Sequence, residues 1–223
     1  MNEHLYPLIS ADVALFSISD TSLQVLLVQR ANHPQKGLWA LPGAILKPDI
    51  DADLEATARR ALRDKLGVEV PYLKQERTFA GAERDPRGWS LSVLYWALLP
   101  LHQVHAVAGS RVEKFEWFNA DDPGALAFDH AEQLGLARSA LRERVKSHSP
   151  PLHLMEEKFT LRQLKTVCEK ILRTNPDDEI VLDKGAFHRR FAKSPDLVAV
   201  LGDKEEGPRR PAQRYRASST FRF

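Results

Sequence analysis

The chain has 223 residues, of which 43% are hydrophobic and 28% charged, and these proportions exclude a largely disordered protein. Its longest apolar stretch, Leu91–Leu101, is too short to cross a bilayer, the N-terminus lacks the pattern of a signal peptide, and the single cysteine, Cys168, excludes an intrachain disulfide, so we expect a cytoplasmic protein without membrane contact. The net charge is only +2, but ten Lys and Arg residues against four Asp and Glu residues lie between Lys184 and Phe223, which indicates either a polyanionic partner or a solvated basic tail.

The first part of the chain alternates between strand and helix patterns. Residues 11–30 predict two strands around the polar turn Ser19–Ser22, followed by a loop rich in proline and glycine. Asp53 is suited to cap a helix that continues to Leu66 and that Gly67 ends. Further strands and a second helix are predicted, in chain order, at Leu73–Phe79, Leu91–Leu98, Lys114–Phe118 and Asp129–Val145.

A segment with two prolines, Lys146–Pro151, is the best candidate for a linker and divides the chain into predicted domains of residues 1–148 and 152–223. Beyond it, Leu161–Leu172 has apolar residues at helical spacing, with Thr160 as its cap, and a shorter helix is expected at about Asp183–Ala192. The hairpin predicted next has its arms at Val198–Leu201 and Gln213–Ala217. Two helices followed by a basic hairpin are typical of a winged helix-turn-helix domain.

The helix expected near residues 53–66 lies in a stretch, Gly43–Val68, that resembles the Nudix signature. That signature presents carboxylates at i, i+3 and i+4 on one helix face, where they hold a divalent cation against a diphosphate. With Arg60 and Gly67 fixing the register, the three carboxylate positions are occupied by Ala61, Asp64 and Lys65. Because the ammonium of Lys65 repels Mg²⁺, the sequence predicts no metal site, no catalytic residue and no cofactor.

Two other interpretations of this helix stay open at this point. One is a working Nudix hydrolase that cleaves ADP-ribose or a similar nucleoside diphosphate with unusual metal ligation. The other is an unrelated surface helix, but Val25–Arg30 and Gly37–Gly43 also match the strand and loop that precede the helix in Nudix proteins. The combined match favours a Nudix-like fold.

The second helix of the C-terminal part has an apolar back and a basic front. Phe187 and Phe191 are four residues apart and are expected to face the core, which turns the basic side chains outward. Such a helix is suited to the major groove of DNA, and the basic hairpin tip is suited to the backbone or minor groove. An RNA-binding or adaptor protein would present a similar surface. The residues expected to contact DNA are Thr160, Arg162, Gln163, Lys184, His188, Arg189, Arg190, Lys193, Arg209, Arg210 and Arg214.

Over residues 11–217 the chain resembles the Nudix-related transcriptional regulators of bacterial NAD metabolism. The motifs that carry the resemblance are Asp53-Leu54-Glu55 before Arg60, Arg84–Gly88, Leu126–Ala131, Phe159-Thr160-Leu161 with Leu164, Phe187 with Arg189 and Arg190, and Arg210-Pro211-Ala212 with Tyr215-Arg216. The resemblance implies an α+β protein in which a Nudix-like α/β/α sandwich is followed by a C-terminal winged helix-turn-helix. It also implies a repressor that senses ADP-ribose or a related nucleotide and binds a double-stranded, pseudo-palindromic DNA operator as a homodimer.

The same resemblance implies an effector site in the Nudix-like part. Arg87 is suited to phosphate and Asp85 to ribose hydroxyls. Trp39 is expected either to stack on adenine or to be part of the core, and Arg60 either to bind ligand or to brace a helix through an ion pair. The candidate ligand-binding residues are Arg30, Trp39, Arg60, Asp85, Arg87 and His130.

Overall fold

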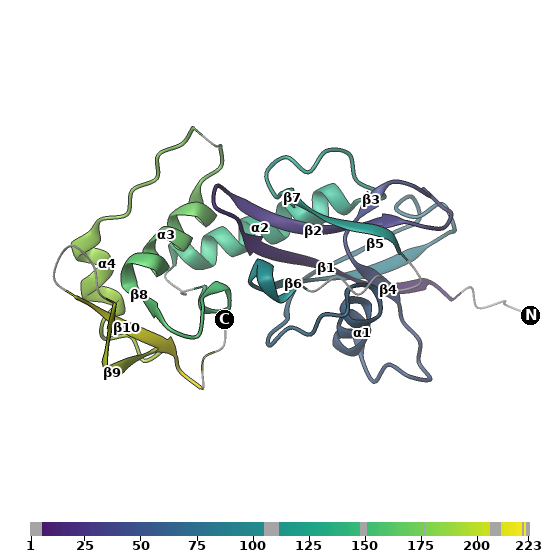
Figure 1. The fold of residues 1–223 in the computed structure, drawn as a ribbon. Coiled ribbons are helices and arrows are strands. Elements are labelled where there is room, and N and C mark those ends of the chain that lie inside the picture. Colours follow the sequence, from purple (N-terminus) through teal and green to yellow (C-terminus); the bar gives the residue numbers. More distant parts are fainter. Residues whose placement is uncertain are drawn as a thin grey trace, which may run out of the picture.

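The computed structural model describes residues 6–104, 112–147, 151–175, 177–205, 211–219 and 221. Figure 1 shows a sheet with helices on its two sides, followed at one end by a smaller group of helices around a short sheet. Together these form the α/β/α sandwich and C-terminal winged helix that the sequence predicts, so the predicted fold class is confirmed. No helix in the described ranges is long and apolar enough to span a membrane.

The large sheet contains all the described strands of the first 119 residues. Its main path runs β3-β2-β1-β6-β5, with β4 beside β1 and β7 beside β2, and β1 and β6 are parallel. The strands are β1 (Leu8–Ile18), β2 (Leu23–Arg30), β3 (Trp39–Ala40), β4 (Gly43–Ile45), β5 (Lys74–Gly81), β6 (Ser90–Leu98) and β7 (Val112–Asn119). The long strands lie where the alternating patterns predict them, whereas the two short strands, β3 and β4, were not predicted.

Strand β1 divides the core into two layers because successive side chains of a strand point to opposite faces. Val13 and Leu15 belong to the cluster that contains Leu62 and Leu66 of α1 (Leu54–Leu66), whereas Phe16 belongs to the cluster that contains helix α2 (His130–Lys146). The two helices therefore cover opposite faces of the sheet. This period-two burial fixes which helix meets which face.

Helix α1 begins and ends through the contacts expected from its sequence. The Asp53 carboxylate accepts a hydrogen bond from the Ala56 N–H at 2.7 Å, and Gly67 adopts a left-handed conformation with φ of 65°. In that conformation the Gly67 N–H donates to the Arg63 carbonyl, which closes the last turn. These two caps fix the rotation of the helix and therefore the side chains that it presents to the neighbouring pocket.

The C-terminal part has the helices and hairpin of a winged helix, and its three strands pair in the order β8-β10-β9. Its elements are β8 (Phe159–Thr160), α3 (Leu161–Leu172), α4 (Lys184–Phe191), β9 (Leu197–Glu205) and β10 (Ala212–Ala217), preceded by the short 3₁₀ turn η2 (Leu152–Leu154). A second 3₁₀ turn, η1 (Leu101–Gln103), follows the large sheet. Both helices and both hairpin arms are confirmed, although β9 extends four residues beyond the predicted arm.

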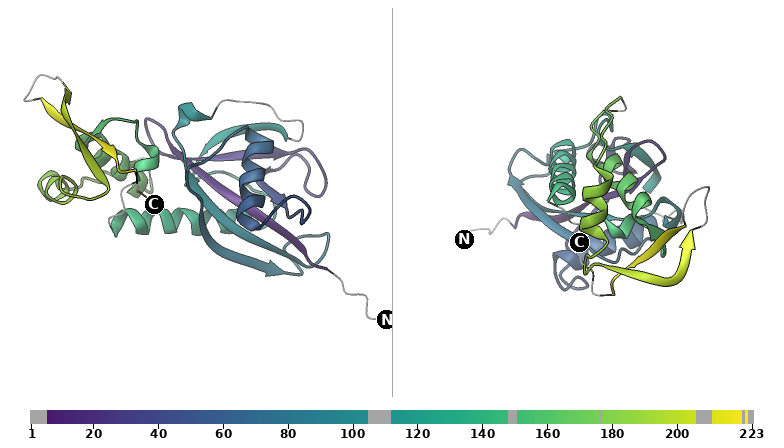
Figure 2. Two further views of the ribbon diagram at one scale, coloured as in Figure 1. Left: turned by 90° about the horizontal axis from the view of Figure 1, so that it is seen from below. Right: turned by 90° about the vertical axis from the view of Figure 1, so that its left-hand side faces the viewer.

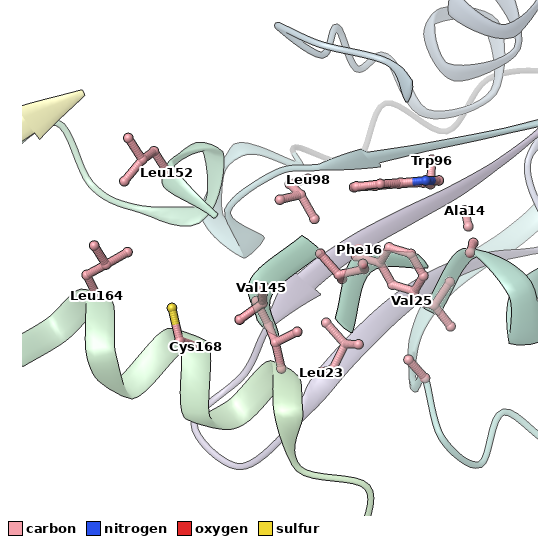
Figure 3. Close-up of a cluster of buried hydrophobic side chains, with 14 of the residues drawn as sticks. Ala14, Phe16, Leu23, Val25, Trp96, Leu98, Val145, Leu152, Leu164 and Cys168 are labelled. Atoms are coloured by element: carbon pink, nitrogen blue, oxygen red, sulfur yellow. The ribbon is translucent and has the colours of Figure 1, made fainter. Parts of the chain in front are cut away.

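The two parts share one apolar cluster (Figure 3). Phe16, Leu98 and Val145 from the sandwich lie in it together with Leu164 and Cys168 from α3. Val145 and Leu152, which flank the predicted linker Lys146–Pro151, belong to this cluster, and residues 148–150 of the linker are outside the described part of the chain. The winged helix is therefore packed against the sandwich and is not only tethered to it.

Polar contacts reinforce this junction. The Arg142 guanidinium on α2 donates to the carbonyls of Ile171 at 2.8 Å and Arg173 at 2.6 Å, and it bonds the Asp121 carboxylate at 2.7 Å. The Lys170 ammonium on α3 donates to the Ser19 carbonyl at 2.9 Å, in the turn between β1 and β2. Because the final carbonyls of a helix lack partners inside the helix, Arg142 acts as a cap for α3 supplied by the other domain.

We expect Arg142→Ala to lower the free energy of unfolding by about 2–3 kcal/mol, because two carbonyls and one carboxylate lose a charged donor. Chemical denaturation followed by circular dichroism measures the change. Lys146→Ala on the same helix is the control, and we expect about 0.5 kcal/mol or less because its pair with Glu143 is exposed. Equal effects of the two substitutions would contradict the capping role.

Candidate functional site

A pocket of about 260 Å³ opens beside β1, β2, β4 and α1 in the sandwich. Its wall is completed by the loop before β6 and by the segment that leads into α2. Most of its polar lining is charged, and cations outnumber carboxylates. The charged, aromatic and histidine side chains of the lining are Asp12, Arg30, Lys65, Arg84, Asp85, Arg87, Phe128 and His130.

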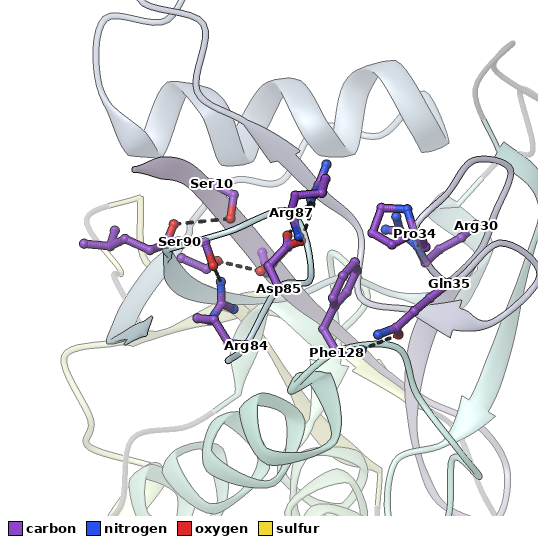
Figure 4. Close-up of polar contacts among 12 residues, drawn as sticks. Ser10, Arg30, Pro34, Gln35, Arg84, Asp85, Arg87, Ser90 and Phe128 are labelled. Atoms are coloured by element: carbon purple, nitrogen blue, oxygen red, sulfur yellow. Dashed lines mark hydrogen bonds and ion pairs between the residues drawn. The ribbon is translucent and has the colours of Figure 1, made fainter. Parts of the chain in front are cut away.

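The loop Arg84–Gly88 forms one wall of the pocket and is held by an ion pair between Asp85 and Arg87 (Figure 4). The buried Asp85 carboxylate accepts hydrogen bonds from the backbone N–H of Arg87 at 2.9 Å and from its guanidinium at 2.6 Å. The Arg87 guanidinium lowers the pKa of Asp85 because its hydrogen bonds favour the charged carboxylate. Two of the predicted ligand residues, Asp85 and Arg87, thus lie at the pocket and are also each other's partners.

Arg84, which directly precedes Asp85 in the same loop, lines the pocket but was not predicted as a site residue. Its guanidinium holds the Asp129 carboxylate through two hydrogen bonds, at 2.8 and 2.9 Å, and donates to the Ser90 hydroxyl at 3.2 Å. Asp129 precedes α2, so this pair ties the pocket wall to the start of that helix. The arginine was visible in the motif, but its partner, 45 residues away, was not.

Arg30 and Phe128 form the opposite side of the pocket. The Arg30 guanidinium lies 4.5 Å from the centre of the Phe128 ring and donates to the Pro34 carbonyl at 2.9 Å. Phe128 adopts a φ of 53°, which is uncommon for a residue with a side chain, and its N–H donates to the Gln35 side chain at 2.7 Å. The strained backbone holds the ring beside the pocket, as Figure 4 shows. Arg30 was predicted here, and Phe128 was not.

His130 and Asp12 lie together at the base of the pocket. The buried His130 ring accepts a hydrogen bond on Nδ1 from the Leu41 N–H at 2.9 Å, so its Nε2 carries the proton and lies 3.7 Å from the Asp12 carboxylate. Burial lowers the pKa of His130, which keeps the ring neutral. Asp12 accepts from the Ser92 hydroxyl at 2.5 Å, and a Cβ at Gly43 would lie 1.9 Å from its other oxygen.

Asp12 was missed because it lies within an apolar run, in the middle of β1. The signal that was available is the carboxylate itself, since a buried acid within a strand needs hydrogen-bond partners or a function. Its partners come from β6 and α2, which the sequence does not place beside it.

Two predicted ligand residues, Trp39 and Arg60, do not line the pocket in the structure. Trp39 packs edge-on against Phe118 with ring centres 4.7 Å apart, which is the core alternative considered for it. Arg60 is buried and donates two hydrogen bonds, both of 2.7 Å, to Asp51, and a third of 2.8 Å to the Ile45 carbonyl. Arg60 therefore braces α1 against the preceding loop, which corrects its assignment as a ligand contact.

Asp51 gives this brace a pH dependence. Hydrogen bonds from Arg60 hold the pKa of the Asp51 carboxyl well below its usual range. A carboxyl with a depressed folded-state pKa stabilises the protein above its unfolded-state pKa and loses that contribution as the pH falls further.

We therefore expect the free energy of unfolding to fall as the pH drops below about 4, the unfolded-state value, and this dependence to weaken in Asp51→Asn. The substitution itself leaves Arg60 without its counter-ion and is expected to cost about 3–5 kcal/mol at pH 7, measured by urea denaturation. Glu55→Gln, which breaks the exposed pair with Arg59, is the control and is expected to cost less than about 1 kcal/mol. An Asp51→Asn variant as stable as Glu55→Gln would show that the brace is dispensable.

The three Nudix ligand positions on α1 do not fit a divalent metal ion. Ala61 is buried and contributes only a methyl group, and Asp64 is exposed and lies 3.9 Å from both Arg60 and Arg63. Lys65 places its ammonium in the pocket wall, where burial lowers its pKa. Among the described residues no three His, Cys, Asp or Glu side chains are grouped closely enough to hold a metal ion.

Helix α4, which carries several of the predicted DNA contacts, lies at the end of the molecule away from the sandwich (Figures 1 and 2). On α4, Phe187 and Phe191 are buried with ring centres 4.5 Å apart, as predicted. The predicted basic residues of this helix and its exit are all exposed: Lys184, His188, Arg189, Arg190 and Lys193. Their side chains form a cationic front beside the β9–β10 hairpin.

The remaining predicted DNA contacts differ in their surroundings. Arg162 is exposed on α3, whereas Thr160 is buried and forms a capping box with Gln163, in which the Gln163 N–H donates to the Thr160 hydroxyl at 3.3 Å. The Thr160 side chain is thus not available to DNA, which corrects that assignment, and the Gln163 side-chain oxygen is held by the cap. Arg214 is half-buried near Asp203, and Arg209 and Arg210 lie outside the described residues.

Comparison with protein families identifies both parts. Residues 9–138 match the model of the NUDIX domain, and residues 151–217 match that of the NrtR DNA-binding winged helix domain. The chain is 39% identical over 212 residues to a protein of Acinetobacter baylyi named ADPR responsive transcriptional repressor NtrR, covering 94% of this chain and 82% of that protein. The chain belongs to the NrtR family.

Solved structures agree with this membership. NrtR of Shewanella oneidensis superposes with a TM-score of 0.80 at 35% identity, covering 95% of this chain and 94% of that one. The same protein complexed with a 27mer DNA gives a TM-score of 0.78 at 34% identity, covering 94% and 93% of the two chains. Its NUDIX domain complexed with ADP ribose gives a TM-score of 0.56 at 39% identity, covering 61% of this chain and 89% of that one.

Proposed function

We propose that this protein is a transcriptional repressor of NAD-related metabolism that binds double-stranded DNA through its winged helix and ADP-ribose or a related nucleotide through its Nudix domain. The observation that carries the proposal is the presence, in one chain, of a cationic pocket whose described residues include no group of three metal-ligating side chains and of a helix, α4, whose basic side chains are exposed. The family relatives support it, since one is named for its response to ADPR and another has structures with DNA and with ADP ribose.

The pocket has the chemistry that a sugar nucleotide with a diphosphate needs. The cations Arg30, Lys65, Arg84 and Arg87 outnumber the carboxylates Asp12 and Asp85, which leaves an excess of positive charge for phosphates. Phe128 provides an aromatic face, although Arg30 covers one side of the ring. The carboxylates are suited to accept hydrogen bonds from ribose hydroxyls.

On the DNA side, α4 is the recognition helix of the proposal and the β9–β10 hairpin its wing. We infer a homodimer on a pseudo-palindromic operator, because dimeric helix-turn-helix proteins read half-sites about one helical turn, roughly 10 bp, apart. The proposed domains are residues 1–148 and 152–223. A cytoplasmic location follows from the DNA partner and from a single, reduced cysteine.

The experiment that tests the DNA arm is a gel shift with promoter fragments. We expect Arg189→Ala with Arg190→Ala to lower the affinity for the operator by about a hundred-fold or more, because each lost base or phosphate contact costs on the order of 1–3 kcal/mol. ADP-ribose is expected to change the affinity of the unaltered protein for the operator.

Arg63→Ala is the matched control for this experiment. It removes one exposed arginine from the Nudix domain, far from α4, and we expect no more than a two-fold change, at the same salt concentration for all variants. Equal retention of DNA by the double variant and by the control would contradict the recognition helix. Tighter binding of RNA than of duplex DNA would favour the RNA-binding alternative.

The second candidate function, hydrolysis of ADP-ribose or a similar nucleoside diphosphate, has the fold in its favour. The donor set on α1 opposes it, because a methyl group and an ammonium stand where two carboxylates are needed. We propose that the protein is not an enzyme.

We therefore expect no release of AMP from ADP-ribose above the uncatalysed level with Mg²⁺ or Mn²⁺, measured by chromatography of the reaction mixture. Metal-dependent turnover by the purified protein, removed by EDTA, would establish the hydrolase instead. A metal-dependent member of the Nudix hydrolases assayed in parallel is the positive control.

A further inference from the structure

The Nudix helix presents a cation to the pocket at a position where Nudix hydrolases present a carboxylate. Lys65 is the penultimate residue of α1 and lines the pocket together with Asp12 and Arg30. Its side chain is partly buried, and the burial lowers the pKa of the ammonium. The N-cap at Asp53 and the left-handed Gly67 fix the two ends of α1, and they thereby fix the helix face on which Lys65 lies.

Lys65 differs from the other cations of the pocket in its partners. Arg84 is held by Asp129, Arg87 by Asp85, and Arg30 by the Pro34 carbonyl and the Phe128 ring. Lys65 makes no hydrogen bond or ion pair with any residue in the part of the chain that the structure describes. Among the described residues, Lys65 is therefore the pocket cation whose charged group has no direct partner.

The carboxylate that acts most strongly on Lys65 is Asp12, which favours the charged ammonium electrostatically. One Asp12 oxygen already accepts hydrogen bonds from Ser92 and Gln133 and faces His130. Arg30 and Arg60 act in the opposite direction and repel the ammonium. The local balance therefore leaves positive charge on this side of the pocket.

An ammonium that is partly removed from water and has no direct hydrogen-bond or ion-pair partner is unfavourable for the free protein. The arrival of an anion reverses that penalty, because Coulomb attraction in a partly desolvated site is stronger than in water. A diphosphate group brings ionised oxygens that accept hydrogen bonds from Lys65, for which a lysine acts as a compact point charge. This cost in the free state and gain in the bound state make Lys65 a determinant of ligand choice.

We infer that the Lys65 ammonium takes the role of the divalent cation of Nudix hydrolases and neutralises the diphosphate of the bound nucleotide, so that ligand binding needs no metal ion. The inference rests on the proposed function, in which the ligand is a nucleoside diphosphate sugar. Because an ammonium offers no coordination site to a water molecule, the same substitution explains a pocket that binds the diphosphate and leaves it intact.

The test measures the affinity of the full-length protein for ADP-ribose by isothermal titration calorimetry, in EDTA and in excess Mg²⁺. We expect the two dissociation constants of the unaltered protein to agree within about two-fold. We expect Lys65→Met, which keeps the length of the side chain and removes the charge, to weaken binding by about ten-fold or more in both buffers, as is usual for a lost charged hydrogen bond. Lys65→Arg keeps the charge and is expected to recover most of the affinity.

The control on the same helix is Arg63→Met, whose side chain is exposed and is not part of this pocket, and we expect its affinity to match that of the unaltered protein. Adenosine, which lacks the diphosphate, is the ligand control, since Lys65→Met is expected to change its binding less than two-fold. Thermal unfolding and operator binding without ligand test whether Lys65→Met is folded. The midpoint of thermal unfolding is expected to be no lower than that of the unaltered protein, because the substitution removes a partly buried charge.

Two results would overturn the inference while the proposed function stands: ADP-ribose binding by the unaltered protein only with Mg²⁺, or binding by Lys65→Met equal to that of the unaltered protein. Failure of the unaltered protein to bind ADP-ribose in either buffer would overturn both the inference and the proposed ligand.

Discussion

The packing of α2 between two domains is the constraint on which the rest of this structure depends. The helix has 17 residues and is about 25 Å long, and it begins with His130, which lines the pocket and directly follows Asp129. Its other end carries Arg142, which bonds the last carbonyls of α3, and Val145, which packs in the cluster shared by the two domains. One rigid element thus contacts both the pocket and the winged helix.

This arrangement gives the pocket a physical route to the DNA-binding surface. Arg84 joins the pocket wall to Asp129, and any ligand that competes for Arg84 changes the contacts at the start of α2. A ligand shifts the placement of the winged helix only by as much as it binds one placement better than another. The shared core limits that movement to a displacement of packed surfaces.

Electrostatics explains how a Nudix fold is suited to sensing. The carboxylate cluster that would bind a metal ion is absent from the described residues of α1, and the pocket instead has the cations of an anion receptor. The residues of the signature that stabilise the helix are retained, since Arg60 braces it through Asp51 and Gly67 ends it. The fold is retained by these contacts, whereas the chemistry depends on which side chain occupies positions 61, 64 and 65.

Sequence patterns predict the order of the long elements, the two caps of α1, the buried faces of α3 and α4 and the exposure of the basic residues on α4. These follow from local rules, namely helical and strand periodicity and capping, which act over a few residues. The pattern of two helices followed by a basic hairpin predicted the winged helix, and the resemblance to a known family supplied its joining to a Nudix domain. Arg30, Asp85, Arg87 and His130 were also placed at the pocket by that route.

The fold, and not the sequence pattern, shows which polar side chains already have hydrogen-bond partners. Arg60 and Thr160 are polar residues in motifs, but their side chains already form hydrogen bonds within the protein. Arg60 bonds Asp51, and Thr160 is part of a capping box. Asp12 lies within an apolar strand and was not predicted as a site residue. Arg84 bonds Asp129, which is 45 residues away in the sequence. The sequence shows only that Lys65 replaces a metal ligand. Its position in the pocket wall, without a hydrogen-bond partner among the described residues, is what suits it to neutralise a phosphate. The reason is physical: hydrogen-bond partners distant in sequence are fixed by packing, which no local pattern contains.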